Sequence, residues 1–162
     1  METKPIKRSK ELMQLSRDHH EGLLLCWKIR TGLKNDTELN RIEEYVLYFF
    51  EHHLKEHFRQ EEEILFPVLE EKHPMKIEVL AQHNDIYAMI EEMKKTNKDA
   101  ERLKKFADHL DDHIRFEERK LFPYIESNTY AEQLEATGKK LEIAHQQQLP
   151  LIWTDEFWLK NK

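Results

Sequence analysis

The sequence predicts an all-α protein, an up-down-up-down four-helix bundle with an additional C-terminal helix and tail. Three observations predict this fold. The 162 residues include only 3 Gly and 5 Pro, which leaves little turn chemistry for a β-rich fold. Charged residues make up 36% and hydrophobic residues 39% of the chain, a balance that suits long amphipathic helices. Apolar residues recur at helical spacing in four stretches joined by short connections, which favours antiparallel neighbours.

The four stretches differ in how they are expected to begin and end. They extend from Leu12 to Leu33, from Asp36 or Thr37 to Phe66, from Ile77 to Met93, and from Leu103 to Phe122. Pro67 is expected to perturb the end of the second stretch, and Pro123 directly follows the fourth. These four stretches make residues 1–126 the expected bundle.

Residues 127–162 are expected to add a C-terminal helix and an aromatic tail packed on the bundle. Residues 130–148 predict a weaker helix broken at Gly138. The tail that follows carries Trp153, Phe157 and Trp158 on an otherwise polar end of the chain. We expect it to be a strap across the bundle, with a homodimer contact or a partner site as the alternative.

Charge, hydropathy and cysteine content exclude several classes of protein. The net charge is −6, and acidic and basic residues are mixed along the chain, so no basic stripe indicates nucleic acid as a partner. No apolar run approaches the roughly 20 residues that span a bilayer, and the first ten residues do not resemble a signal peptide. The single cysteine, Cys26, excludes an internal disulfide and a thiolate cluster. We therefore expect a soluble, cytoplasmic protein without a membrane partner.

An internal repeat is the most informative feature of the sequence. Residues 53–70 read HLKEHFRQEEEILFPVLE and residues 109–126 read HLDDHIRFEERKLFPYIE, and ten of the eighteen positions are identical. Each copy places a histidine four residues before a glutamate, His57 with Glu61 and His113 with Glu117. At this spacing both side chains leave the same face of a helix one turn apart, so both can reach one ion.

These histidines and glutamates lie on the apolar faces of their helices, and the other two helices each add a histidine to an apolar stripe. His19 falls between Leu15 and Leu23, and His83 falls between Val79 and Ile86. The bundle axis would then collect at least four imidazoles and two carboxylates, as in carboxylate-bridged di-iron bundles. A buried carboxylate is costly to keep ionised, by several kcal/mol, and a metal ion supplies the compensating charge.

The ligand types indicate the metal. Nitrogen and carboxylate oxygen without thiolate suit iron, manganese, zinc or copper, and bridging carboxylates in a helical bundle favour pairs of iron or manganese ions. Zinc sites usually stop at four ligands around one ion. The expected cofactor is therefore two non-haem iron ions, with manganese or zinc as the alternatives.

At these residues the sequence resembles the hemerythrin-like proteins, also called the HHE cation-binding domain family. The resemblance covers roughly residues 9–126, and HFRQEEEILFP and HIRFEERKLFP carry it, with RDHHEG and AQHNDI as weaker elements. It implies a hemerythrin-like four-helix bundle with a di-iron site. The implied bridging ligands are Glu61 and Glu117, the implied terminal ligands are His19, His57, His83 and His113, and His109 is the first choice for a fifth histidine.

Several residues near the expected site have alternative interpretations. His20 is the alternative to His19, and His53 is expected to support the ligands rather than to bind metal. Glu62 and Glu118 rotate off the inward face, so we expect them to be solvated or salt-bridged. The remaining histidines, His52, His73 and His145, are expected at the surface or in turns, and Tyr87 is expected to fill core or to hydrogen-bond a bound oxygen species.

The resemblance to the family's oxygen carriers is incomplete in the third helix. Those carriers have two histidines in this helix, four residues apart. Here His83 has Val79 before it and Tyr87 after it. The resemblance therefore implies binding or sensing of O2, NO or iron rather than reversible oxygen carriage. The alternatives are a di-iron oxidase or peroxidase-like enzyme and an iron-storage or stress-repair protein.

Overall fold

The computed structural model describes residues 7–95 and 98–160, and all regular structure within them is helical. The first long segment is α1 (Met13–Lys34), and the third is α4 (Pro74–Lys95). The second segment consists of α2 (Leu39–Phe49), η1 (Phe50–Leu54), α3 (Lys55–Gln60), η2 (Glu61–Leu65) and the 3-10 turn η3 (Phe66–Val68). The fourth consists of α5 (Ala100–Phe116), η4 (Glu117–Leu121) and α6 (Phe122–Asn128), and α7 (Ala131–Gln146) follows it.

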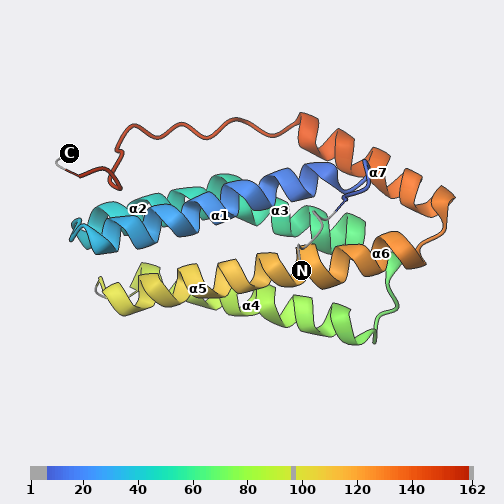
Figure 1. Cartoon of the computed structure of the whole chain (residues 1–162), viewed down its shortest axis with the longest axis horizontal. Coiled ribbons are helices and arrows are strands. Elements are labelled where there is room, and N and C mark those ends of the chain that lie inside the picture. Colours follow the sequence, from blue (N-terminus) through green and yellow to red (C-terminus); the bar gives the residue numbers. More distant parts are fainter. Residues whose placement is uncertain (1–6, 96–97, 161–162) are drawn as a thin grey trace, which may run out of the picture.

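The helices form a bundle. Figure 1 shows α1, α2 with α3, α4, and α5 with α6 lying side by side, with their axes roughly aligned. The most extensive of these contacts is between α1 and α5, and α4 also packs on α5. None of the helices among the described residues combines the length and the apolar character that crossing a membrane requires. The expectation of an all-helical bundle is confirmed for the described residues.

The apolar core of the bundle is divided into two clusters along its length. One cluster contains Ile29, Val46 and Phe106, and the other contains Leu15, Leu65 and Phe122. Along each long segment the residues of one cluster give way to those of the other, and the histidines and glutamates of the repeat lie at this change. The apolar clusters therefore enclose a polar layer.

Among the described residues three short segments are π-helical, and two of them begin at equivalent positions of the sequence repeat. η2 begins at Glu61 and η4 begins at Glu117, the repeated glutamates. π turns within α-helices are frequent at functional sites because they change which way a side chain points. The helix also continues past Pro123, contrary to its expected end, because the proline stands in the first turn of α6, where its missing N–H costs little.

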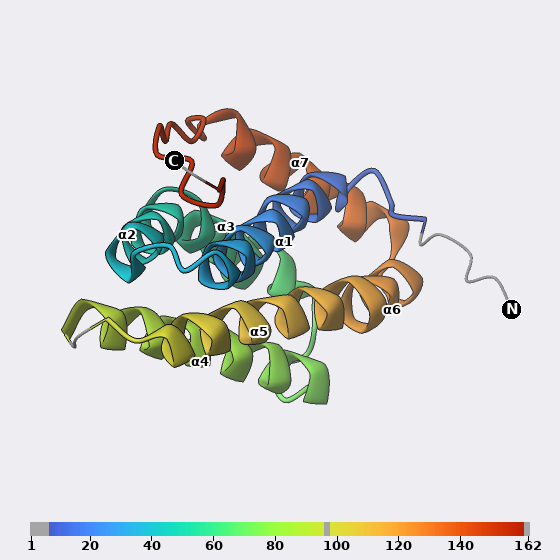
Figure 2. The same cartoon turned by 60° about the vertical axis from the view of Figure 1, so that its left-hand side comes forward.

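The C-terminal helix α7 is continuous through Gly138, so the prediction of a break there is wrong. A Cβ atom at Gly138 would lie 2.8 Å from Glu11 Cγ and 3.2 Å from Glu11 Cα. The glycine therefore permits the close approach of α7 to the residues before α1, and it does not interrupt the helix. α7 packs on α1 and η2, and Figure 2 shows it crossing the bundle over these elements.

Residues 147–160 run from the end of α7 back along the bundle, as Figure 1 shows. Phe157 is fully buried, with its ring 3.1 Å from the position that a Cβ of Gly32 would take. Thr37 Oγ1 donates to the Phe157 carbonyl over 2.9 Å, and Arg41 pairs with Asp155 at 2.6 Å. The aromatic tail thus packs on the α1–α2 end of its own bundle, as a strap would.

Candidate metal centre

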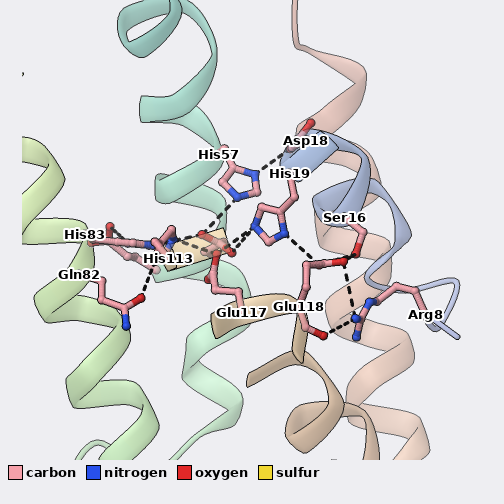
Figure 3. A network of polar contacts seen from close by, with 12 residues as sticks. Arg8, Ser16, Asp18, His19, His57, Gln82, His83, His113, Glu117 and Glu118 are labelled. Atoms are coloured by element: carbon pink, nitrogen blue, oxygen red, sulfur yellow. Dashed lines mark hydrogen bonds and ion pairs between the residues drawn. The ribbon is translucent and has the colours of Figure 1, made fainter. Parts of the chain in front are cut away.

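Six buried polar side chains meet between the two apolar clusters, and all four long segments contribute to them. They are His19 of α1, His57 of α3, Glu61 at the start of η2, His83 of α4, His113 of α5 and Glu117 at the start of η4. None of them is more than 4% exposed. Figure 3 shows how the rings and carboxylates converge.

The six side chains form two overlapping groups in which the nitrogen and oxygen atoms lie within 4.8 Å of one another. The first, which we call the His19/His57 group, contains His19, His57, Glu61 and Glu117. The second, the His83/His113 group, contains His83, His113 and the same two glutamates. Each group offers four ligand atoms of the types that bind iron, manganese or zinc.

Glu61 lies between the two groups. Its Oε1 atom is 3.3 Å from His57 Nε2 in one group and 3.2 Å from His83 Nε2 in the other. Its Oε2 atom is 3.8 Å from His19 Nε2. One carboxylate therefore faces ring nitrogens from three helical segments.

Glu117 repeats this arrangement from the opposite helix. Its Oε1 atom is 2.9 Å from His19 Nε2 and 3.0 Å from His113 Nε2, so it too faces one ring of each group. Gly22 of α1 allows the two helices to approach here, because a Cβ at that position would lie 2.7 Å from Ile114 Cδ1 of α5. The two repeated glutamates thus hold equivalent places in the centre.

Each of the four rings also has a fixed orientation, because its second nitrogen has a hydrogen-bond acceptor. The Nδ1–H of His19 donates to Glu118 over 2.9 Å, that of His57 to Asp18 over 2.9 Å, that of His83 to Glu62 over 2.9 Å, and that of His113 to Gln82 over 2.7 Å. These bonds leave every Nε2 directed at the shared carboxylates. Histidines that bind metal are held in the same way, with the distal N–H donated to a carboxylate or carbonyl oxygen.

The centre has an approximate two-fold symmetry that follows the sequence repeat. The residue after each repeated glutamate crosses to a neighbouring helix, so that Glu62 reaches α4 and Glu118 reaches α1. Asp18 and Gln82 directly precede His19 and His83, the histidines outside the repeat, which we call the lone histidines. Asp18 accepts from His57, and Gln82 accepts from His113. Aromatic rings follow the same symmetry. Phe66 lies 5.6 Å from His83, and Phe122 lies 5.2 Å from His19, between ring centroids.

The electrostatics of the centre favour added positive charge. Burial alone would lower the pKa of His57, but the facing carboxylates of Glu61 and Asp18 outweigh burial and raise the pKa to about 9. Burial also opposes the protonation of His83, and Glu61 with Glu62 raises the pKa of His83 to about 9. For Glu61, burial favours the neutral acid, yet the surrounding imidazoles hold its pKa well below the ordinary value.

The donor atoms fit a metal ion better than they fit one another. Among the described residues, several buried polar atoms at this point have no hydrogen-bond partner. They are the Nε2 atoms of His57, His83 and His113, both carboxylate oxygens of Glu61, and Glu117 Oε2. Buried polar atoms without partners are costly, and native proteins rarely keep several of them together. Cations placed in the two groups would give these atoms partners.

The structure brings together six of the seven residues proposed as ligands from the sequence, and it separates the seventh. His19 is buried in the centre, whereas the neighbouring His20 is exposed. His109 is exposed and lines a surface hollow between α4 and α5, so it does not take the place expected for a fifth histidine. At this level of α5 the inward positions are taken by the buried side chains of Phe106 and Leu110 instead.

The sequence did not predict the four residues that accept hydrogen bonds from the rings. Two of them were missed, and two were given another role. Asp18 and Gln82 were missed, although each directly precedes a lone histidine. Glu62 and Glu118 were expected to be solvated or salt-bridged; each accepts a hydrogen bond from a ring instead of facing solvent, and Glu118 also lies 3.7 Å from Arg8. The repetition of the pair Glu-Glu in both copies of the repeat was the signal that pointed to them.

Three further residues near the centre lie outside the two groups. His145 of α7 was expected at the surface, but it is partly buried, and its Nε2 donates to Asp18 over 3.0 Å. His53 Nε2 lies 4.0 Å from the other oxygen of Asp18. Tyr87 donates its hydroxyl to Glu62 over 3.2 Å. Asp18 therefore connects the centre to α7, and Glu62 connects it to Tyr87.

The sequence of residues 10–125 matches the family model of the hemerythrin HHE cation binding domain. The chain belongs to this family. The match spans well over half of the chain and includes all six buried residues of the centre. The resemblance inferred from the repeat is therefore confirmed, and a cation-binding role agrees with the buried donor groups. Searches of curated proteins and of solved structures returned no significant match.

Proposed function

We propose that this HHE-domain protein binds a pair of non-haem iron ions in an up-down-up-down four-helix bundle. Glu61 and Glu117 would bridge the pair, His19 and His57 would complete one position, and His83 and His113 would complete the other. The observation that carries the proposal is that one oxygen of each glutamate lies within 3.3 Å of a ring from each group. Bridging carboxylates with imidazoles in a helical bundle favour a pair of iron or manganese ions over zinc, and the resemblance to the hemerythrin-like family favours iron of these two.

Metal content tests this proposal directly. Protein expressed in iron-supplemented medium and purified without an affinity tag should contain two iron ions per chain. Glu61→Gln should lose most of this iron while retaining the helical circular dichroism signal, because the amide cannot bridge two cations. Glu63→Gln is the matched control, since Glu63 is two residues away, exposed, and paired with Arg59. Unchanged iron content in Glu61→Gln would contradict the bridging role.

We further propose that the centre serves to bind or sense a small ligand, O2 or NO, or iron itself. When bound, a ferrous pair supplies electrons and open coordination positions to a diatomic molecule. The chain supplies the enclosure: the six residues are at most 4% exposed, so the burial favours a ligand of a few atoms over a larger substrate. Phe58, stacked on His83 with ring centroids 3.9 Å apart, keeps part of this enclosure apolar.

Rapid mixing of the reduced, iron-loaded protein with O2 or NO separates binding from turnover. A single stoichiometric change in absorption that then persists would support ligand binding. Continued consumption of O2 or peroxide beyond one equivalent would instead support the alternative, an oxidase or peroxidase-like enzyme. Uptake of iron well above two ions per chain would support iron storage.

A further inference from the structure

The approximate two-fold symmetry of the centre is broken at one pair of equivalent residues. Asp18 and Gln82 each directly precede the lone histidine of their helix, and each accepts the Nδ1–H of a repeat histidine. Asp18 presents a carboxylate oxygen to His57, whereas Gln82 presents a neutral amide oxygen to His113. The other two rings both donate to carboxylates, Glu118 and Glu62, so they do not differ in this way.

This difference changes how strongly each ring donates to a cation. A ring N–H forms a stronger hydrogen bond with a carboxylate than with a neutral amide. The stronger bond makes the opposite ring nitrogen a more basic ligand. In the His19/His57 group both rings have this assistance, from Glu118 and Asp18. In the His83/His113 group only His83 has it.

The charged neighbours of these acceptors do not cancel the difference. Arg8 lies 3.7 Å from Glu118 but makes its short ion pair, at 2.7 Å, with Glu126. His145 Nε2 lies 3.0 Å from Asp18 Oδ2, the oxygen that also accepts the Nδ1–H of His57 at 2.9 Å, so His145 shares this acceptor without displacing His57 from it. Glu62 accepts a further hydrogen bond from the hydroxyl of Tyr87, which is neutral. The carboxylate of Asp18 therefore remains the main asymmetry.

We propose that the two metal positions are unequal, and that the His19/His57 position fills first and holds its ion more tightly because Asp18 supports His57. This inference rests on the proposed function, since it concerns the two positions of the same centre. Support of this kind typically changes metal affinity by about tenfold to a hundredfold. Asp18 acts through His57 and is a positioning residue.

Titration of the metal-free protein tests the proposal without reference to activity. Co²⁺ or Zn²⁺ is added in competition with a chromogenic chelator, so that two binding steps are resolved. The wild-type protein should bind in two steps that differ by about tenfold or more. Asp18→Asn should weaken the first step, because its amide oxygen keeps the hydrogen bond to His57 without the charge. Gln82→Glu, the matched variant, should strengthen the second step.

Combining the two substitutions should reverse the order of filling. A crystal of the wild-type protein loaded with one equivalent of metal should show anomalous scattering between His19 and His57, and the double variant should show it between His83 and His113. Two equal steps in the wild type, unchanged by either substitution, would overturn the inference, as would first filling of the His83/His113 position. Absence of any binding by the wild type would instead count against the proposed function.

Discussion

Each histidine of the centre uses its two ring nitrogens for different purposes. The Nδ1–H is donated to a fixed acceptor, and the Nε2 is turned toward the shared carboxylates. The spacing of histidine and glutamate in the repeat predicted which residues face inward, because a spacing of four places both on one face of a helix. It could not predict the acceptors, because Asp18 and Gln82 act across helices, and single-helix periodicity does not report on neighbouring helices.

At the same scale, the centre predicts how the stability of the metal-free protein depends on pH. The pKa of His57 and that of His83 are raised from 6.5 to about 9, so the folded state binds these protons more tightly than the unfolded state. This stabilisation is fully present below pH 6.5 and is lost as the pH rises through 9. We expect the urea midpoint of the metal-free protein to fall over this window.

The metal-loaded protein provides the comparison for this experiment. Its Nε2 atoms hold cations instead of protons, and metal binding is favoured when the competing protons leave. The fall between pH 6.5 and 9 should therefore be absent from the loaded protein. Parallel curves for the two forms would show that groups outside the centre cause the dependence.

At the scale of the elements, glycine and proline produced the differences between expectation and structure. Gly138 was expected to break a helix and Pro123 to follow the end of one, yet α7 continues through Gly138 and α6 contains Pro123. Sequence alone does not distinguish a glycine that ends a helix from one that admits a neighbour, because the neighbour, here Glu11, is distant in the chain. The four long helical stretches were predictable because each carries a continuous apolar face of its own.

Gly138→Ala tests the role of this glycine. Alanine favours an isolated helix by about 1 kcal/mol over glycine, so a free helix would be stabilised. Here the added Cβ would lie 3.2 Å from the Glu11 backbone and 2.9 Å from its Cβ. We therefore expect a loss of about 1–3 kcal/mol in the free energy of unfolding, by overpacking. Glu135→Ala, on an exposed position of α7, should change it little, and stabilisation by Gly138→Ala would show that α7 is not pressed against Glu11.

At the scale of the whole molecule, metal binding and the packing of the tail lie at different places along the bundle. The composition and the repeat predicted the bundle and its polar layer, but they left the strap and the dimer contact as alternatives for the tail. That choice depends on tertiary contacts, such as the Phe157 ring against Gly32, which no local pattern encodes. Gly32 is thirteen residues after His19 on α1, so about 20 Å of helix separates this contact from the centre.

This separation predicts that stability and metal binding can be changed independently. Phe157 is fully buried, so Phe157→Ala should lower the free energy of unfolding by about 3 kcal/mol, near the lower end for large buried aromatic rings because the tail can partly relax. Its iron content should remain that of the wild type. Leu149→Ala, at a residue that is 86% exposed in the same tail, should change neither property. Glu61→Gln should show the opposite pattern, lost iron with the helices retained, so loss of iron in Phe157→Ala would mean that the tail supports the centre over the length of α1.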